Sequence, residues 1–235
     1  MQIFYAPHIE NGVAVLDEEE SRHLLTVLRH PVGAVLHLSD GQGRRFTAEL
    51  IEAGKKQAVL RVLSELPGLP PPPFHLHVGI SPIKNMERFE WFLEKATELG
   101  VSAVTPLMCR RTERQHLRMD RLQKILVAAM KQSARDHLPV LHPPLAFPEW
   151  VAAQTAPRRF IGWIPEGMPA AHLNAFLEPA TDAVVAIGPE GDFHPDEVAL
   201  AQENGFQSVS LGAARLRTET AGVLAVALLR EGGKL

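Results

Sequence analysis

Apolar and polar residues alternate along the first 66 residues in a pattern typical of short strands. The stretch 33–66, "GAVLHLSDGQGRRFTAELIEAGKKQAVLRVLSEL", carries turn signals at Asp40-Gly41, Gly43 and Gly54. Acidic residues in a first turn predict an earlier helix from Asp17 to about Arg29. The prolines of "LPGLPPPP", residues 66–73, cannot continue a helix or a central strand, so we expect one domain over 1–70 and another over 71–235.

Beyond the proline run the periodicity changes to strands that alternate with helices. Strands are predicted over 74–81, 101–108, 158–164, 182–188 and 208–212, and helices over 85–100, 120–136, 194–205 and 218–232. Pro195 opens the third of these helices. The alternation predicts an α/β domain with a mainly parallel sheet that is covered on both faces.

The composition is that of an ordinary globular chain, with 46% hydrophobic and 22% charged residues. The N-terminus has no secretion-signal pattern and no apolar run is long enough to span a membrane, so a cytoplasmic location is expected. Cys109 is the single cysteine, which argues against a disulfide framework or a cysteine-based metal site. His75 and His77 share a strand face, where packing is a better explanation than metal binding.

The net charge of −3 argues against a protein that coats nucleic acid non-specifically, but the charge is unevenly distributed. The segment 109–135 holds eight basic residues against two acidic ones. It is either a solvated helix face or a local phosphate-binding surface.

Two glycine-containing turns near the C-terminus suggest a ligand site. The turn Gly188–Asp192 ("GPEGD") and the turn around Gly212 each follow an apolar strand, where ligands sit in open α/β sheets. The first carries two carboxylates and no lysine, and the GxGxxG and GxxxxGK[ST] phosphate-binding patterns are missing. Carboxylates would repel a diphosphate. S-adenosylmethionine has an adenosine end and a positive centre, so it suits these turns better than a diphosphate does. Either turn alone is weak evidence, since such loops are common.

Together the motifs resemble a known family. "IGPEGDFHPDEV" followed by "VSLGAARLRTETA" is similar to the C-terminal signature of the RsmE family, SPOUT-class methyltransferases that modify N3 of a uridine in small-subunit (16S) ribosomal RNA. "RFEWFLEKATELGVSAVTPL", "AAMKQSARDHLP" and "HLLTVLRHPVGAVLHLSDGQGRRFTAEL" extend the resemblance over nearly the whole chain. Asp192, where the family usually has glycine, and Lys131, where an acid is expected, depart from it.

The resemblance implies a PUA-like β-barrel, an α/β domain with a C-terminal trefoil knot, and an antiparallel homodimer without a membrane anchor. It also implies that S-adenosylmethionine is the cofactor, bound by three loops at the knot. Carried over to this chain, the cofactor-binding residues are Ile164, Pro165, Ile187, Gly188, Pro189, Glu190, Gly191, Leu211, Gly212, Leu216 and Thr218.

Methylation at N3 of uracil requires loss of a proton, and a cation beside O2 or O4 would stabilise the resulting anion. Arg217 is the residue expected in that role, and Glu219 is expected either as general base or as the group that orients Arg217. A plain helix N-cap is the simpler interpretation of Thr218 and Thr220. The residues expected to bind RNA are Arg22, Arg29, Arg44, Arg45, Arg88, Arg110, Arg111 and Arg135.

Two other functions compete with the methyltransferase. The first is a non-catalytic RNA-binding protein with a degenerate α/β domain, which the intact "GPEG" and "RLRTET" stretches disfavour. The second is a nucleotide-dependent oxidoreductase, disfavoured because GxGxxG is missing.

Overall fold

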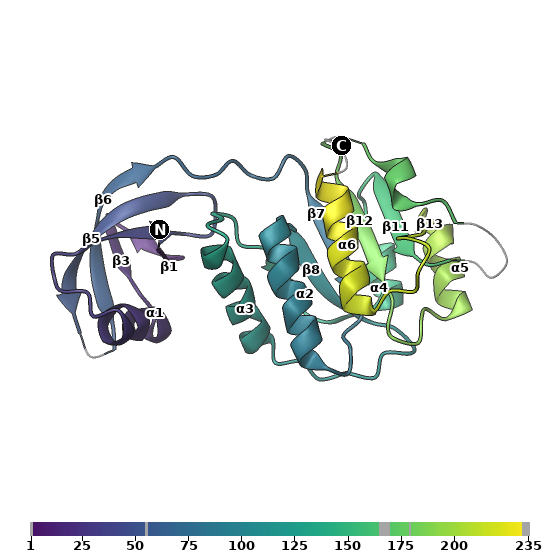
Figure 1. Cartoon of the computed structure of the whole chain (residues 1–235), viewed down its shortest axis with the longest axis horizontal. Coiled ribbons are helices and arrows are strands. Elements are labelled where there is room, and N and C mark those ends of the chain that lie inside the picture. Colours follow the sequence, from purple (N-terminus) through teal and green to yellow (C-terminus); the bar gives the residue numbers. More distant parts are fainter. Residues whose placement is uncertain (1, 55, 165–169, 179, 232–235) are drawn as a thin grey trace. The chain divides into compact units, whose positions relative to one another are not determined.

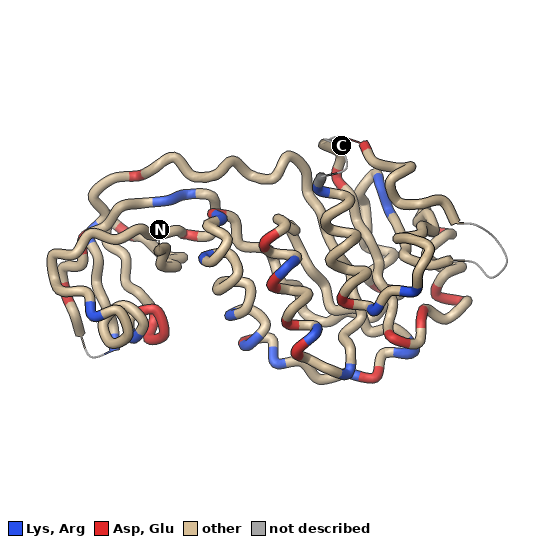
Figure 2. The backbone as a smooth tube through the Cα atoms, in the orientation of Figure 1, with Lys and Arg blue, Asp and Glu red and all other residues tan. Residues whose placement is uncertain are grey.

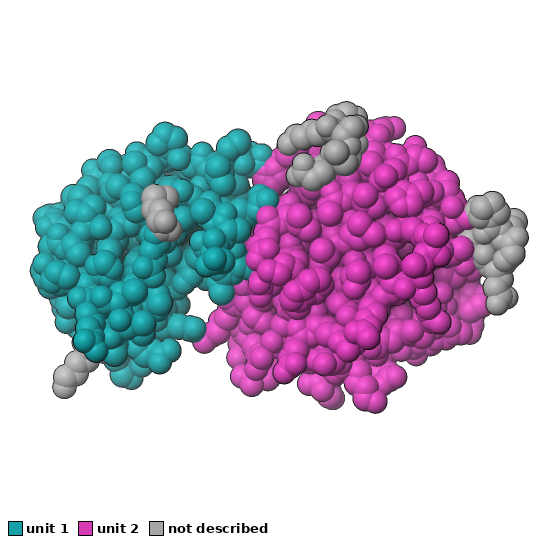
Figure 3. Space-filling model, in the orientation of Figure 1, with its two compact units in different colours: residues 1–71, 127–138 teal, residues 72–126, 139–235 magenta. Residues whose placement is uncertain are grey.

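The computed structural model describes residues 2–54, 56–164, 170–178 and 180–231. The described chain forms two compact units (Figure 3). Unit 1 comprises residues 1–71 and 127–138, and unit 2 comprises 72–126 and 139–235. A segment from the middle of the sequence thus belongs to the N-terminal unit.

Unit 1 is built on a six-stranded sheet, counted over the described residues, that curls around its own core (Figure 1). Its order is β1-β4-β5-β6-β3-β2, in which β1 and β4 are parallel and the other pairs antiparallel. Alternate residues of the central strand β5, Phe46, Ala48 and Leu50, point into the core, as a period of two requires. The strands are β1 (Ile3–Tyr5), β2 (Ile9–Glu10), β3 (Val13–Val15), β4 (Val35–Ser39), β5 (Arg45–Ala53) and β6 (Ala58–Leu66), which confirms the predicted short strands.

The early helix begins as predicted but ends differently. In α1 (Glu18–Arg22) the Asp17 carboxylate caps the helix by accepting the N–H of Glu20 at 2.8 Å. The chain then widens into a π-helical turn, His23–Val27, and Arg29 takes a left-handed conformation with φ +58°. The prediction of one regular helix to Arg29 is therefore wrong in its second half.

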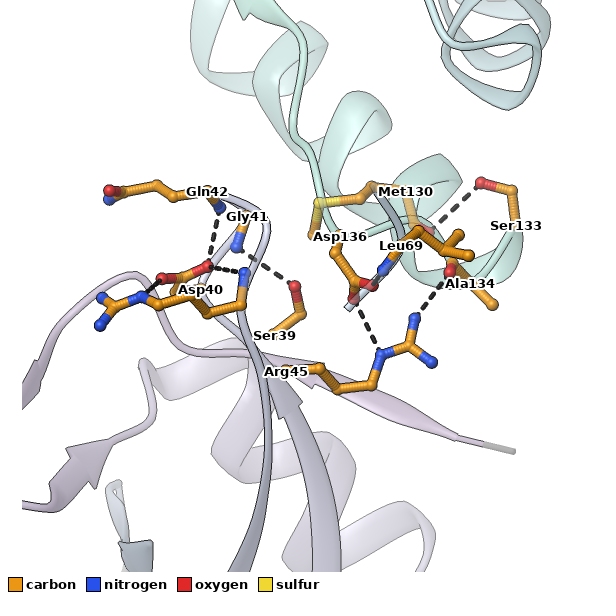
Figure 4. A network of polar contacts seen from close by, with 11 residues as sticks. Ser39, Asp40, Gly41, Gln42, Arg45, Leu69, Met130, Ser133, Ala134 and Asp136 are labelled. Atoms are coloured by element: carbon orange, nitrogen blue, oxygen red, sulfur yellow. Dashed lines mark hydrogen bonds and ion pairs between the residues drawn. The ribbon is translucent and has the colours of Figure 1, made fainter. Parts of the chain in front are cut away.

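Helix α3 (Met119–Gln132) contributes its second half to unit 1, where a buried carboxylate holds the segment that follows it. Asp136 accepts hydrogen bonds from Arg45 Nε at 2.9 Å and from the N–H of Leu69 at 2.8 Å (Figure 4). The same arginine donates through Nη2 to the carbonyl of Ala134 at 2.7 Å. The helix predicted to Asp136 stops at Gln132, because Ala134 turns the chain with φ +53°.

Lys131, where the resemblance leads us to expect an acid, forms an ion pair with Glu20 of α1. Both side chains are largely buried. A buried carboxylate needs a cationic partner, so the pairing with Glu20 explains why a lysine stands at position 131.

Unit 2 contains a parallel sheet of seven strands within the described residues. Its order is β10-β8-β7-β12-β11-β13, with β9 paired to β8. This confirms the predicted parallel α/β sheet. The strands are β7 (Leu76–Ile80), β8 (Ala103–Met108), β9 (Val140–Leu141), β10 (Leu145–Ala146), β11 (Arg158–Gly162), β12 (Ala183–Ile187) and β13 (Gln207–Val209).

The helices predicted for this unit begin and end close to their sequence signals. Asn85 caps α2 (Met86–Leu99) by accepting the N–H of Glu87 at 2.9 Å, and Gly100 ends it in the left-handed conformation. Pro195 opens α5 (Pro195–Glu203) after the cap His194. The closing helix is α6 (Thr218–Glu231). Helix α4 (Phe147–Ala152) and the short 3₁₀ helix Leu173–Phe176 were not predicted.

Two adjacent residues of β7 show how the helices cover the two faces of the sheet. A Cβ on Gly79 would meet Trp150 of α4, and Ile80 lies against Gly222 of α6. Successive strand residues point to opposite faces, so α4 and α6 cover opposite faces. Helix α2 packs beside α6, and α5 packs beside α4 (Figure 1). Among the described residues, no helix combines the length and apolar character needed to cross a membrane.

Candidate functional site

Unit 2 holds a pocket of about 480 Å³ at the carboxyl ends of β11, β12 and β13. Its walls come from the segments that follow these strands, together with the first turns of α2 and α6. Parallel strands deliver their C-terminal loops to one edge of a sheet, and this edge is the usual ligand site of open α/β folds.

Most of the residues predicted to bind the cofactor line this pocket. They are Ile164, Ile187, Gly188, Pro189, Glu190, Leu211, Gly212, Leu216 and Thr218. Gly191 belongs to the same turn but does not line the pocket. Pro165 lies outside the described residues.

The turn Gly188–Asp192 uses its carbonyl groups in hydrogen bonds within the protein. Thr218 Oγ1 donates to the carbonyl of Gly188 at 3.1 Å, and the N–H of Asp192 donates to that of Pro189 at 2.9 Å. Arg111 Nη1 donates to the carbonyl of Gly191 at 2.6 Å. No hydrogen bond among the described residues uses the N–H groups of Glu190 and Gly191. Glu190 lines the pocket, so its N–H group is available to a ligand that carries hydrogen-bond acceptors.

The interpretation of Thr218 and Thr220 as a plain helix N-cap is wrong. Helix α6 begins at Thr218, and the hydroxyl of this residue donates to Gly188 instead of capping the helix. The contact joins the first turn of α6 to the turn after β12. Thr220, two positions on, also lies inside the helix and not at its cap position.

Gly188 has little room for a side chain. A Cβ built at this position would lie 3.0 Å from the ring of Phe193, which is 2% exposed. Asp192 has φ +65°, a conformation that glycine adopts more readily, and its carboxylate accepts the N–H of Phe193 at 2.8 Å. The aspartate that departs from the family pattern is thus held by a local hydrogen bond.

The pocket wall carries charges of both signs. Its basic residues are Arg88, Arg215 and Arg217, and its acidic residues are Glu190 and Asp192. Sequence reasoning missed Trp163 and Arg215 as wall residues, although both lie within two residues of positions that it selected. The basic residue two positions before Arg217 was a signal that could have been used.

Glu219, the other predicted catalytic residue, does not line the pocket. Its carboxylate is 8% exposed and lies 3.9 Å from Arg88 Nε, and Arg88 does line the pocket. Burying a carboxylate is unfavourable unless a cation or donors compensate for it. The glutamate is thus placed to hold Arg88 instead of Arg217.

The arginines predicted to bind RNA differ in their surroundings. In unit 1 Arg22 and Arg29 are exposed, and Arg44 is exposed while its Nε donates to Asp40 at 2.7 Å. Arg135 follows α3, whose basic residues are visible in Figure 2. Arg45 is 12% exposed and bound to Asp136, so its guanidinium is held inside unit 1 by this ion pair instead of facing RNA.

In unit 2 the paired arginines at the end of β8 bind the neighbouring α5 region. Arg110 Nη1 donates to Asp196 at 2.7 Å, and Arg111 contacts the turn after β12 as described above. These two arginines of the basic segment, which the sequence leaves open as a solvated helix face or a phosphate-binding surface, are thus engaged within the protein.

Two titratable groups away from the pocket wall, the half-buried His77 and the buried Cys109, have shifted pKa values. Burial lowers the pKa of His77 from its ordinary value of 6.5 to about 3, with further contributions from His142 and His75. The ring of His77 shares a hydrogen bond with Thr105 Oγ1 at 2.7 Å. Burial, assisted by the Glu197 carboxylate, raises the pKa of the Cys109 thiol and keeps it protonated.

Family models match both parts of the chain. Residues 70–230 match the RNA methyltransferase domain, and residues 16–63 match the RNA methyltransferase PUA domain. The first match covers more than half of the chain and includes every residue of the pocket wall. The fold and the site thus define an RNA methyltransferase.

Individual relatives identify the branch. The ribosomal RNA small subunit methyltransferase E of Synechocystis is 32% identical over 225 residues, which cover 93% of this chain and 73% of the relative. A probable rRNA-methyltransferase structure from Porphyromonas gingivalis has a TM-score of 0.89 with 36% identity, covering 98% of both chains. The ribosomal RNA small subunit methyltransferase E structure from Neisseria gonorrhoeae, bound to S-adenosyl methionine, has a TM-score of 0.87 with 31% identity, covering 97% of this chain and 96% of the other. The chain belongs to the ribosomal RNA small subunit methyltransferase E family.

Proposed function

We propose that the protein transfers a methyl group from S-adenosylmethionine to N3 of a uridine in 16S ribosomal RNA. The observation that carries the proposal is the pocket at the carboxyl ends of β11, β12 and β13, in a chain whose family modifies RNA. The Neisseria gonorrhoeae relative, with the same fold, binds S-adenosyl methionine. The trefoil knot implied by the resemblance stays a prediction.

The residues present suit such a donor. A pocket of about 480 Å³ falls in the range of small-molecule sites, roughly 300–1,000 Å³. The N–H groups of the Gly188–Asp192 turn suit the acceptors of an adenine or a carboxylate, and the carboxylates of Glu190 and Asp192 suit a positive centre. When bound, S-adenosylmethionine supplies an electrophilic methyl group.

Arg217 is the residue that we propose to act on the substrate base. It lines the pocket next to Thr218, which is fixed to the Gly188 turn. A guanidinium beside O2 or O4 would stabilise the uracil anion that forms when N3 loses its proton. This interaction strengthens as negative charge develops, so it would lower the barrier to methyl transfer.

Glu219 has an orienting role in this proposal. Its carboxylate pairs with Arg88 and does not line the pocket, which supports an orienting role over that of a general base. Arg88 would then present its remaining donors to a phosphate of the target nucleotide, because bidentate contacts of this kind suit a guanidinium.

The RNA would reach the site with its target base unstacked, since N3 lies on the pairing edge of uracil. Arg22, Arg29, Arg44 and Arg135 are our candidates for contacts to the RNA backbone, with Arg88 at the pocket. We further propose that the protein works as a homodimer on the assembled small subunit, in the cytoplasm where ribosomes are made.

Mass spectrometry of nucleosides from 16S ribosomal RNA tests the function. RNA from cells that lack the protein should lose one 3-methyluridine, and the wild-type gene should restore it while an Arg217→Ala gene should not. Calorimetry on the purified protein tests the oxidoreductase alternative, which would prefer NAD to S-adenosylmethionine. A methyl-transfer assay tests the alternative of a non-catalytic RNA-binding protein, which would bind RNA without methylating it. An unchanged nucleoside profile in the deletion strain would refute the proposal.

A further inference from the structure

The four residues that follow β8, Cys109–Thr112, form a brace beside the pocket. The hydroxyl of Thr112 is buried, accepts the N–H of Cys109 at 2.9 Å and shares a hydrogen bond with Ser81 Oγ at 2.7 Å. Ser81 directly follows β7. The brace is therefore fixed to the ends of two central strands.

A second buried group fixes the brace to the start of α5. Glu197 is 4% exposed and accepts the N–H of Arg110 through Oε1 at 2.9 Å. Its other oxygen accepts the N–H of His194, the cap residue of α5, at 2.8 Å. Charge-assisted hydrogen bonds in a buried site are among the stronger ones, so the backbone at Arg110 is well determined.

From this position the next side chain extends across the turn of the pocket. Arg111 Nη1 donates to the carbonyl of Gly191 at 2.6 Å and lies 3.4 Å from the carbonyl of Phe193. Its Cδ lies 3.4 Å from the place that a Cβ on Gly191 would occupy, so the stem of the side chain covers that glycine. The guanidinium thus holds carbonyl groups at two positions of one loop.

We propose that Arg111 is a positioning residue for the methyl donor, an inference that rests on the proposed function. Its hydrogen bond to the carbonyl of Gly191 ties the turn to the brace. Gly191 does not line the pocket, so this contact does not occupy the space for the donor. The N–H group of Glu190, which lines the pocket, is then held for the donor without the cost of ordering the loop on binding. This assignment replaces the RNA-binding role that the sequence alone suggests for Arg111.

Ligand-free protein gives the first test, through hydrogen exchange of the Asp192 and Phe193 amides, whose N–H groups are hydrogen-bonded. Arg111→Gln should speed this exchange, because the turn loses its tie to the brace. Arg114→Gln is the matched control, since it removes a charge from the same basic segment and Arg114 bonds the carbonyl of His116 instead of the turn. Equal exchange in wild type, Arg111→Gln and Arg114→Gln would overturn the positioning role.

Calorimetry and steady-state kinetics give the second test. Arg111→Gln should weaken binding of S-adenosylmethionine about tenfold, as the loss of one charge-assisted hydrogen bond does, and raise KM for the donor while KM for RNA stays constant. Arg111→Lys should recover part of the affinity, and Arg114→Gln should keep it within about twofold. If Arg111→Gln keeps the donor affinity but raises KM for RNA and lowers the salt dependence of RNA binding by about one unit, Arg111 is an RNA contact and the inference is wrong.

The two tests separate this inference from the function on which it rests. Faster exchange in Arg111→Gln supports the tie to the turn even in a protein that binds no donor, and absence of donor binding by the wild type would refute the proposed function. A melting temperature equal to that of the wild type checks that the variant is folded. Should Arg111→Gln fail to fold, Arg111→Lys gives the comparison with a smaller expected effect, since lysine recovers part of the contact.

Discussion

Arg45 and Asp136 are 91 positions apart in the sequence and form a buried ion pair, with 2.9 Å between Arg45 Nε and Asp136 Oδ1. Arg45 begins β5, and Asp136 lies in the segment after α3. The same carboxylate binds the N–H of Leu69 in the proline-rich stretch (Figure 4). Unit 1 therefore depends on a segment that lies beyond the proline run.

Loss of this carboxylate should destabilise the protein strongly. Asp136→Ala leaves a largely buried guanidinium and a backbone N–H without their partner, which typically costs about 3–5 kcal/mol. Denaturant unfolding followed by circular dichroism should show a lower midpoint than the wild type. The control is Arg61→Ala, which breaks the more exposed pair with Glu49 in the same unit and should cost less than about 1 kcal/mol. Equal midpoints for the two variants would contradict the role given to Asp136.

A methyl group at Gly188 should damage the donor site. The new Cβ of Gly188→Ala would lie 3.0 Å from the buried ring of Phe193, so the ring or the turn must give by a few tenths of an ångström. We expect at least a tenfold loss of S-adenosylmethionine affinity by calorimetry. Gly191→Ala, whose Cβ would meet Arg111 at 3.4 Å, should cost less. If both variants bind equally well, steric pressure from Phe193 does not shape the site.

Removal of the guanidinium at position 217 should separate binding from catalysis. Arg217→Ala is expected to keep donor affinity within about threefold and to lose roughly 100-fold or more in kcat, as when a transition-state donor is removed. Single-turnover transfer of a radiolabelled methyl group to small subunits from a deletion strain measures the rate. Turnover near the wild-type value would rule out the proposed role.

Acid should destabilise unit 2 through His77. The unfolded histidine binds a proton near pH 6.5 and the folded one near pH 3, so between these values the unfolded state holds more protons. Stability contributed by the neutral ring is complete above pH 6.5 and is lost as the pH falls, by up to about 1.4 kcal/mol per pH unit.

The His77→Gln variant isolates this contribution. Its free energy of unfolding should depend less steeply on pH between 6.5 and 4 than that of the wild type, in urea titrations at several pH values. His116→Gln, at an exposed position, should keep the wild-type slope. A His77→Gln slope equal to that of the wild type would show that His77 is not responsible.

Local signals made much of the fold predictable. Asn85 and Gly100 bound α2, and Pro195 opens α5, because caps and helix starts depend on neighbouring residues. The end of α3 was not predictable in the same way, since the turn at Ala134 is held by Arg45, which is remote in sequence. Helix α4 is six residues long in a proline-rich stretch, too short for a clear period.

The site shows the same division between local and remote information. The sequence motifs identified the turn Gly188–Asp192 and the segment before α6, because each is contiguous. Arg111, which holds the turn, comes from the segment after β8, and Arg88, which pairs with Glu219 of α6, comes from α2. The positions of basic residues in the sequence do not distinguish arginines that bind a loop of the protein from arginines that are free to bind a phosphate.

A crystal structure of the protein with S-adenosylmethionine tests the location of the donor site most sharply. We expect the adenosine of the donor against the turn Gly188–Asp192, with an acceptor at the N–H group of Glu190, and its methyl group facing Arg217. Density for the donor elsewhere, or none at saturating concentration, would refute the proposed site.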